Sequence, residues 1–583
     1  MKTMNLPKTL SIAELKQKYQ SMKLTPETVI QEIVKRAETD QDYNIWITPP
    51  SLENIQPYLD QLSTMDPEHT PLWGIPFALK DNIDLAGIET TAGCPEFAYK
   101  PKENATVAKR LIDAGAIPVG KTNLDQFATG LVGTRSPFGE AKNALNPELI
   151  SGGSSSGSAV SVARGLAAFS LGTDTAGSGR VPAALNRLVG YKPSLGAWPL
   201  KGVVPACASI DCVNVFANSL EEALVVDEVL RGFEETDPWS RTIKRGSNDL
   251  PEKILLLNEE PRFFGPFAAE YKQAWELTLE RIKELDIPVE YIDGGYLAEA
   301  AAVLYDGPWV AERWSDLGDF IENHQNAAFP VTETVLRSGA KPEYDAASVF
   351  KALHTLQVFK QKAHLQLENA VLIMPTAGGT WTRDEVRENP IQTNSEMGLY
   401  TNHCNLLDLC AVAVPSQDAA KNLPFGITLF SANKNEHLIA GAADLFLHDR
   451  CSTVKKTTTL IAVCGLHMRG FPLEKQMVEH GAVFVCEAKT APKYKMVRLP
   501  SEPPKPGLIQ TRGTGAAIEL ELWEIPLSNL GYFTELIPSP LGIGKVELED
   551  GTSVVGFICE SAAADTAEDI TSSGGWRYVK GIK

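Results

Sequence analysis

Apolar residues recur at helical spacing near the start of the chain. Ser11 with Glu14 three positions later matches a capping box, which marks the beginning of a helix. Thr25 and Pro26 mark a second helix, because proline is favoured in the first helical turn. The apolar residues of this second helix fall on one face: Val29, Ile30, Ile33, Val34 and Ala37.

Helix and strand patterns alternate further along the chain. Residues 105–116 predict a helix that leads into a short strand at 117–120. The small apolar residues of 158–168 predict a core helix, in which we expect Gly165 to be tolerated at a cost of about 1 kcal/mol. Such alternation favours an α/β layered sheet.

The composition changes near residue 450. Residues 437–448 predict a last helix, and polar, aperiodic residues follow it. Strand patterns separated by Pro/Gly loops come next, at 460–464, 482–486, 517–523 and 554–559. We therefore predict a first domain over 1–450, a linker over 451–458 and a smaller domain over 459–583, either α+β or a small barrel-like sheet.

Composition and charge narrow the class of protein. The chain has 583 residues and a formal net charge of −19, from 54 basic and 73 acidic residues. This balance argues against a nucleic-acid surface, which needs clustered Lys and Arg. The N-terminal residues lack a signal peptide's apolar core, and no apolar run reaches about 18 residues, so we expect no membrane span. The nine cysteines are never spaced C-x-x-C, which predicts reduced thiols in a cytoplasmic protein.

Two glycine turns that carry serines give the clearest chemical signal. They are G-G-S-S-S-G-S at 152–158 and D-T-A-G-S-G-R at 174–180. Glycine lets such turns bring backbone N–H groups close to a ligand, although either turn alone is more often an ordinary loop. Together they outline an acyl-transfer site with Ser178 as the nucleophile. The N–H groups of the predicted oxyanion hole belong to Thr175, Ala176 and Gly177.

A serine nucleophile needs a base, and Lys80 is the candidate. It ends a short apolar run, so its ammonium is expected to be partly buried. Burial disfavours the charged form of a lysine, and a neutral lysine can accept a proton. The alternative is a surface lysine paired with Asp81 or Asp84. No histidine lies in the stretch that carries the serines, so the economical relay runs from Lys80 through Ser154 to Ser178.

The first serine turn also matches the G-x-S-x-G elbow of α/β-hydrolases, at Gly153–Gly157. An elbow must follow a buried strand and open a helix. Residues 143–151 contain two asparagines and a proline and do not predict such a strand. We therefore favour the lysine relay over the elbow.

These residues resemble the amidase signature family, whose Ser-cisSer-Lys triad hydrolyses amides. The match rests on the three relay residues and on K-T-N-L-D-Q-F-A-T-G-L-V-G-T-R-S-P-F-G at 121–139 and G-T-D-T-A-G-S-G-R-V-P-A at 172–183; it covers roughly residues 9–450. Both motifs are similar to those of allophanate hydrolases, although most relatives have glycine in place of Ala176. The resemblance implies a mixed β-sheet covered by helices, a cis peptide bond at Ser154, and hydrolysis of allophanate (urea-1-carboxylate) to ammonia and CO2 without a metal or cofactor.

A substrate with a carboxylate needs a cation near the nucleophile. The segment 304–314 resembles the family's carboxylate-recognition segment, which implies that Tyr305 and Arg313 contact the substrate. Gly130 matches the position where the family's backbone approaches it. Without the resemblance, Arg313 is equally typical of a surface helix residue paired with a neighbouring acid, Glu312 or Asp316.

The C-terminal region carries a resemblance of its own. G-L-H-M-R-G-F-P-L at 465–473 and P-L-G-I-G-K-V at 540–546 resemble the C-terminal domain of allophanate hydrolases, whose fold is similar to that of γ-glutamylcyclotransferases. The resemblance implies that His467 assists decarboxylation of N-carboxycarbamate. The alternative is a histidine without a chemical role in a module that dimerises. The family also implies a homodimer and a urea carboxylase as functional partner.

Two other functions stay open at this point. One is a different amidase of the same family, malonamidase-like or part of an amidotransferase, although the acidic surface and the extra domain argue against action on tRNA. The other is a structural partner in a urea-degrading assembly. The function that we favour is that of an amidohydrolase acting on linear amides.

Overall fold

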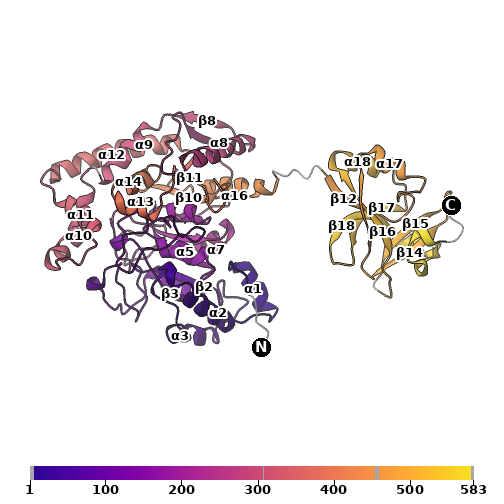
Figure 1. Cartoon of the computed structure of the whole chain (residues 1–583), viewed down its shortest axis with the longest axis horizontal. Helices are drawn as coiled ribbons and strands as arrows, with labels where there is room; N and C mark the ends of the chain where they lie inside the picture. The colour runs from indigo at the N-terminus through magenta and orange to yellow at the C-terminus, as the bar shows by residue number, and fades with distance from the viewer. Residues whose placement is uncertain (1–5, 306, 453–457, 512, 580–583) are drawn as a thin grey trace. The chain divides into compact units, whose positions relative to one another are not determined.

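The computed structural model describes residues 6–305, 307–452, 458–511 and 513–579 (Figure 1). It forms two compact units, Met1–Leu447 and His448–Lys583, each with its own hydrophobic core. Helix α16 (Glu436–Ser452) contains the predicted last helix of the first domain and continues past the boundary between the units. Of the predicted linker 451–458, residues 451–452 belong to α16 and Thr458 begins β12 (Thr458–Val463), while 453–457 lie outside the described residues.

Capped helices begin the chain, as the sequence predicts. In α1 (Ile12–Gln20), Ser11 Oγ accepts a hydrogen bond from Glu14 N at 3.4 Å. The reciprocal pair of bonds that makes a capping box occurs instead at α2 (Pro26–Thr39), between Thr25 and Thr28. The predicted apolar face of α2 is buried in the first unit, apart from Val34, which is partly buried.

A mixed sheet forms the centre of the first unit (Figure 1). Among the described residues it has eleven strands, in the order β1-β3-β2-β4-β6-β5-β10-β11-β9-β7-β8. The bounds are β1 Trp46–Thr48, β2 Pro76–Lys80, β3 Ile117–Thr122, β4 Phe169–Thr173, β5 Val189–Lys192, β6 Val213–Ala217, β7 Lys253–Leu257, β8 Val289–Ile292, β9 Ala370–Pro375, β10 Leu409–Pro415 and β11 Gly426–Ala432. β2 lies parallel to β3 and β4, and all three are buried along their whole length. Parallel strands covered on both faces suit such apolar sequences.

Helices cover this sheet and carry the loops of the site. Their bounds are α3 Leu52–Leu62, α4 Thr106–Asp113, α5 Ser156–Ala163, α6 Val181–Leu185, α7 Leu220–Leu230, α8 Ala268–Glu284, α9 Gly295–Tyr305, α10 Val310–Asn323, α11 Pro330–Arg337, α12 Ala346–Gln366, α13 Arg383–Glu388, α14 Gln392–Met397 and α15 His403–Leu406. In Figure 1, α9 to α12 lie at the opposite end of the unit from α1 to α3. The predicted mixed sheet covered by helices is confirmed.

The predicted helix at 158–168 is shorter than expected. Helix α5 ends at Ala163, and Gly165 lies beyond it with a φ of +67°. A Cβ at this position would lie 1.8 Å from the carbonyl oxygen of Lys8. Gly165 is therefore not a tolerated helical residue: the chain needs glycine there to leave the helix and enter β4.

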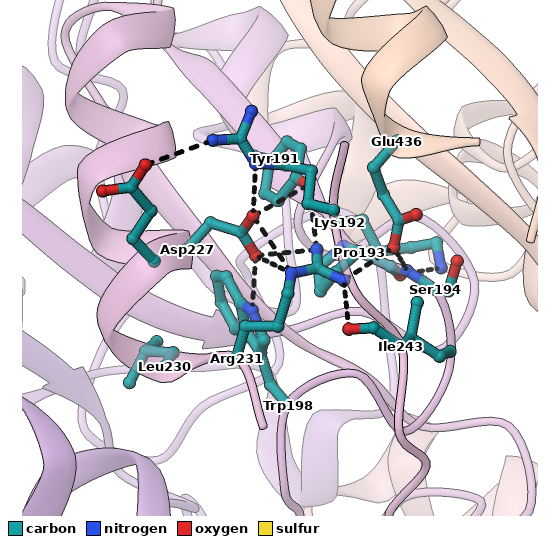
Figure 2. Close-up of polar contacts among 12 residues, drawn as sticks. Tyr191, Lys192, Pro193, Ser194, Trp198, Asp227, Leu230, Arg231, Ile243 and Glu436 are labelled. Carbon is teal, nitrogen blue, oxygen red and sulfur yellow. Dashed lines mark hydrogen bonds and ion pairs between the residues drawn. The ribbon is translucent and has the colours of Figure 1, made fainter. Parts of the chain in front are cut away.

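A buried ion-pair network joins α7, α16 and the chain after β5 (Figure 2). Arg231 donates to Asp227 Oδ1 at 2.8 Å and to Glu436 Oε1 at 3.2 Å. Asp227 also accepts from Trp198 Nε1 at 2.8 Å, and Glu436 accepts from Ser194 N at 3.0 Å. Both carboxylates are fully buried. Buried charges are costly unless paired, so this network holds the beginning of α16 at one place on the core.

The second unit contains two sheets. Its strands follow the orders β13-β16-β12-β18-β17 and β15-β14-β19. The bounds are β12 Thr458–Val463, β13 Val483–Lys489, β14 Tyr494–Leu499, β15 Lys505–Gln510, β16 Glu519–Pro526, β17 Leu541–Glu547, β18 Ser553–Cys559 and β19 Glu568–Asp569, with helices α17 Glu474–Glu479 and α18 Leu527–Glu535. The four predicted strand runs correspond to β12, β13, β16 and β18, which confirms a smaller domain of helices and strands.

The cysteines with described side chains are free thiols, and all of them except Cys486 are buried. Burial raises the pKa of the Cys207 thiol to about 12, so it stays protonated and unreactive near neutral pH. No helix in the described part of the chain combines the length and the apolar character that a membrane crossing needs.

Candidate active site

Lys80 is fully buried at the end of β2. Its Nζ donates to Ser154 Oγ at 2.8 Å and to Thr173 Oγ1 at 2.7 Å. Thr173 ends β4, the parallel neighbour of β2, so the two strands bring their polar side chains to the same edge of the sheet. The interpretation of Lys80 as a surface lysine paired with Asp81 is wrong, because Lys80 is buried and Asp81 pairs with Lys121 at 3.2 Å.

Burial also sets the ionisation of this lysine. It lowers the pKa of Lys80 to about 7, although the charges of Asp125, Asp211 and Asp174 oppose the shift. A lysine with this pKa is largely neutral at slightly alkaline pH and can accept a proton from the hydroxyl that it contacts. The charge of Arg313 also lowers the pKa of Lys80, which places the two cations in one electrostatic environment.

The peptide bond between Gly153 and Ser154 is cis, as the family resemblance implies. Asp125 lies against it: its N–H donates to Ser154 O at 3.0 Å, and its carboxylate accepts from Gly133 N at 3.0 Å and Arg135 N at 2.8 Å. A Cβ on Gly153 would lie 2.0 Å from Asp125 Oδ2, so only glycine permits this approach. Asp125 was not predicted from the sequence, where its only signal is its place in the 121–139 motif.

The second serine turn is wound around Asp174. This buried carboxylate accepts from Gly177 N at 2.8 Å and Gly179 N at 3.0 Å, and it forms a two-point ion pair with Arg180 at 2.9 Å. Ser155 Oγ of the first turn donates to Thr173 O at 3.1 Å, directly before Asp174. Thr173 therefore contacts Lys80 through its hydroxyl and the first serine turn through its carbonyl, and it directly precedes the second serine turn.

The bond from Gly177 to Asp174 corrects the predicted oxyanion hole. The N–H of Gly177 already has an acceptor inside the turn, so it is not available to an oxyanion. The N–H groups of Thr175 and Ala176 donate to no acceptor among the described residues. Ser178 itself is almost completely buried. Of the three predicted donors, those of Thr175 and Ala176 therefore remain.

Arg313 belongs to the same region and is not a surface residue. It is 1% exposed in the first turn of α10, where Nη1 donates to Thr129 Oγ1 at 2.7 Å and Nη2 to Tyr305 Oη at 3.4 Å. The alternative pairing with Glu312 is wrong, because that carboxylate accepts from Ser209. The Nε–H of Arg313 has no acceptor among the described residues.

Gly130 lies between these features. A Cβ there would lie 2.6 Å from Asp125 Oδ2, and the preceding residue, Thr129, contacts Arg313. Asp125 in turn contacts the backbone of Ser154. The structure therefore brings Lys80, Ser154 and the three predicted substrate-binding residues, Gly130, Tyr305 and Arg313, into one buried region.

His467 belongs to the second unit and lines a separate cavity of about 190 Å³. Its Nε2 shares a hydrogen bond with Gln476 Oε1 at 3.0 Å, and its ring stacks on Phe557 with centroids 5.0 Å apart. Burial lowers the pKa of His467, although the bond to Gln476 opposes the shift. Lys505 lines the same cavity and carries no motif that could single it out in the sequence.

The mixed sheet and the paired serine turns define an amidohydrolase. The family model described as Amidase matches residues 28–439, and the chain therefore belongs to the amidase family. A second model, the allophanate hydrolase C-terminal domain, matches residues 459–580.

Three relatives show how far the likeness extends. Urea amidolyase of Saccharomyces cerevisiae is 39% identical over 580 residues, which cover 93% of this chain and 31% of that protein. This chain thus spans about a third of the length of the urea amidolyases that it matches. The structure of Kluyveromyces lactis allophanate hydrolase is 36% identical, covers 98% of this chain and 99% of its own, and has a TM-score of 0.71. One component of the glutamyl-tRNA(Gln) amidotransferase of Deinococcus radiodurans is 38% identical over 74% of this chain and 96% of its own length.

Proposed function

We propose that this chain hydrolyses allophanate, a small amide that carries a carboxylate. The observation that carries the proposal is the buried guanidinium of Arg313, which shares a region with Lys80 and Ser154 and keeps an Nε–H without an acceptor among the described residues. A buried cation with an unused donor suits a planar carboxylate. Likeness to allophanate hydrolase over both units supports the same substrate.

In the proposed first step, neutral Lys80 accepts the hydroxyl proton of Ser154, and Ser154 accepts that of Ser178. The Ser178 oxygen bonds to the carbon of the terminal amide. The carbonyl oxygen becomes an oxyanion, which the N–H groups of Thr175 and Ala176 stabilise. When this intermediate collapses, the bond from carbon to nitrogen breaks. The proton returns from Lys80 through the serines to the leaving nitrogen, which departs as ammonia.

Water then attacks the acyl-enzyme, giving its proton to the same relay, and releases N-carboxycarbamate with Ser178 restored. N-Carboxycarbamate loses CO2, and the carbamate that remains decomposes to ammonia and a second CO2. In both steps Arg313, with Tyr305 beside it, holds the distal carboxylate. This contact fixes the amide carbon against Ser178.

A second proposal concerns the C-terminal unit, which would assist the decarboxylation. Its cavity combines His467, Gln476 and Lys505 with apolar walls. Apolar walls weaken the solvation of a carboxylate and so favour the loss of CO2, while Lys505 supplies a cation for the second carboxylate. The lowered pKa of His467 keeps the ring neutral near pH 7, where its hydrogen bond to Gln476 orients it.

We also propose that the chain acts as a homodimer and that a urea carboxylase supplies its substrate. The urea amidolyases, one third of which matches this chain, support the functional link. A malonamidase-like or amidotransferase function is the rival. The amidotransferase component of D. radiodurans matches 74% of this chain, whereas the allophanate hydrolase match spans 98%.

Ammonia release by the purified chain tests the main proposal. We expect allophanate to be the preferred substrate over malonamate and glutamine. Ser178→Ala should abolish the reaction, and Ser154→Ala and Lys80→Ala should each lower kcat by at least about 100-fold. Ser315→Ala, at an exposed serine of α10, is the control. Near-normal activity in the three site variants would contradict the relay, and a preference for glutamine or malonamate would favour the rival.

A further inference from the structure

A turn at Ala206–Asp211 contacts the loop that carries the proposed oxyanion donors. Asp211 Oδ1 accepts from Thr175 Oγ1 at 2.5 Å. The same carboxylate accepts from Ala206 N at 2.7 Å and from Cys207 N at 3.2 Å, which closes the turn on itself. Asp211 is almost completely buried, and its one carboxylate holds the Thr175 side chain against the backbone of the turn.

The same turn also contacts the helix that carries Arg313. Ser209 N donates to Glu312 Oε1 at 2.8 Å, and Ser209 Oγ donates to Glu312 Oε2 at 2.6 Å. Glu312 precedes Arg313 in the first turn of α10. The Cys207 thiol lies beside the Arg313 guanidinium, and both side chains are buried. One short segment thus touches both ends of the site in which the substrate would lie.

Asn405 of α15 forms a second link between the turn Ala206–Asp211 and the serine loop. Its Nδ2 donates to Asp174 O at 2.6 Å and to Ile210 O at 2.7 Å. A single side-chain amide therefore ties the backbone of the turn to the residue directly before Thr175. The turn has two attachments to the serine loop and two to α10.

We propose that the turn Ala206–Asp211 is a positioning element that sets the separation between the oxyanion donors beside Thr175 and the guanidinium of Arg313. It thereby selects amides whose carboxylate lies at one short distance from the reacting carbonyl. This inference rests on the proposed hydrolysis of allophanate and names what determines specificity there. Asp211 and Glu312 are the positioning residues, one at each attachment, because a site must be held to within fractions of an ångström to favour one substrate.

The attachment to α10 is tested with Glu312→Ala in the full chain. We expect KM for allophanate and malonamate to rise about tenfold with kcat within about threefold, and kcat/KM for the neutral amide propionamide to stay within about twofold. Glu312→Gln keeps one acceptor oxygen for the N–H of Ser209 and should recover most of the affinity. Asp316→Ala, at an exposed acid of the same helix, is the matched control. A loss of stability alone would lower the active fraction and leave KM unchanged.

The attachment to the serine loop is tested with Asp211→Asn and Thr175→Val. Each should lower kcat by about 100-fold on the carboxylated and the neutral amide alike, because both need the oxyanion donors. The double variant should lose little more than either single one, because the two changes break the same contact. Independent damage to the fold would instead multiply the two losses.

Two results would overturn the inference. The first is an equal change on carboxylated and neutral amides in Glu312→Ala, or no change on either. The second is a double variant whose loss is the product of the single losses. A wild-type chain that does not prefer a carboxylated amide contradicts the proposed function instead, and the pair Asp211 and Thr175 can still be measured on propionamide.

Discussion

Lys80 lies among three buried carboxylates, and the balance between burial and their charges sets the pH at which it can act as a base. Burial is the larger effect and lowers the pKa of Lys80 to about 7. Protonated lysine cannot accept a proton, so kcat/KM for allophanate should fall about tenfold per pH unit below about pH 7 and level off above it. Initial rates of ammonia release from about pH 5.5 to about pH 9 measure this profile. A flat profile across pH 7 would exclude Lys80 as the base.

The position of Arg313 leads to a prediction about substrate preference. Replacing it with alanine removes a buried cation with a planar fork, which is worth about 2–4 kcal/mol to a bound carboxylate. We expect Arg313→Ala to lower kcat/KM for allophanate by about 30-fold to 1,000-fold and to change that for propionamide by less than about threefold. Steady-state kinetics with both substrates measure the difference.

Two further variants sharpen this test. Arg313→Lys keeps the charge without the fork and should recover only part of the loss. Arg337→Ala removes an arginine of α11 that pairs with Glu333 at the surface, and should leave both substrates unaffected. Equal losses on the two substrates in Arg313→Ala would make this arginine a structural residue.

The sequence contains the signals from which Lys80, Ser154 and Arg313 could be predicted. Lys80 and Ser154 follow from the chemistry that a serine nucleophile needs, whereas the role of Arg313 came only from the resemblance of its segment to the family. Asp125 and Asp211 could not be found in this way, because they bind backbone N–H groups of their own loops, and Asp211 also binds the hydroxyl of Thr175. Such contacts depend on how each loop folds and not on a recognisable motif. The N–H of Gly177 was assigned wrongly for the same reason: its acceptor, Asp174, depends on how the turn is wound.

At the scale of elements, periodicity located some of the helices and strands, among them α4, α5 and β3, but not all of their ends. The pattern of 158–168 continues past Ala163, yet α5 ends there because the chain meets the carbonyl of Lys8 beside Gly165. Lys8 and Gly165 are far apart in the sequence, so the residues around Gly165 do not indicate where the helix ends. The strand runs of the C-terminal region were predicted correctly, since alternating and continuous apolar runs are local properties.

The network around Arg231 leads to a prediction about the stability of the first unit. Arg231→Met removes the cation that Asp227 and Glu436 share and leaves two buried carboxylates with fewer partners (Figure 2). Asp227 keeps an ion pair with Arg245 at 3.1 Å, but Glu436 loses the cation beside it. We expect the free energy of unfolding of the first unit to fall by about 3–5 kcal/mol, because a buried charge without its partner is costly. Urea denaturation followed by tryptophan fluorescence measures it, since Trp198 donates to Asp227.

An exposed arginine provides the control for this prediction. Arg187 pairs with Asp418 at the surface, so Arg187→Met should change the free energy of unfolding by less than about 1 kcal/mol. If both variants cost the same, the buried network contributes no more than a surface ion pair. Its role in holding the beginning of α16 would then be excluded.

At the scale of the molecule, the two units have separate interiors. Each buried apolar cluster that the structure describes lies wholly within residues 6–446 or wholly within residues 461–576. The proposed acyl-transfer residues all belong to the first unit, and His467 belongs to the second. The shift in composition near residue 450 could reveal this division, because each domain carries its own kind of periodicity.

This separation predicts that the two proposed reactions can be divided. A chain that ends near residue 455 keeps the core of the first unit, so we expect it to release the first ammonia from allophanate at a rate within about threefold of the full chain. Because N-carboxycarbamate also decomposes unaided, the final yield of ammonia does not report on the second unit. The appearance of CO2, followed by rapid mixing, should lag behind ammonia in both the truncated chain and His467→Ala. If neither variant slows CO2 release, the second unit has no part in decarboxylation, and dimerisation becomes its remaining proposed role.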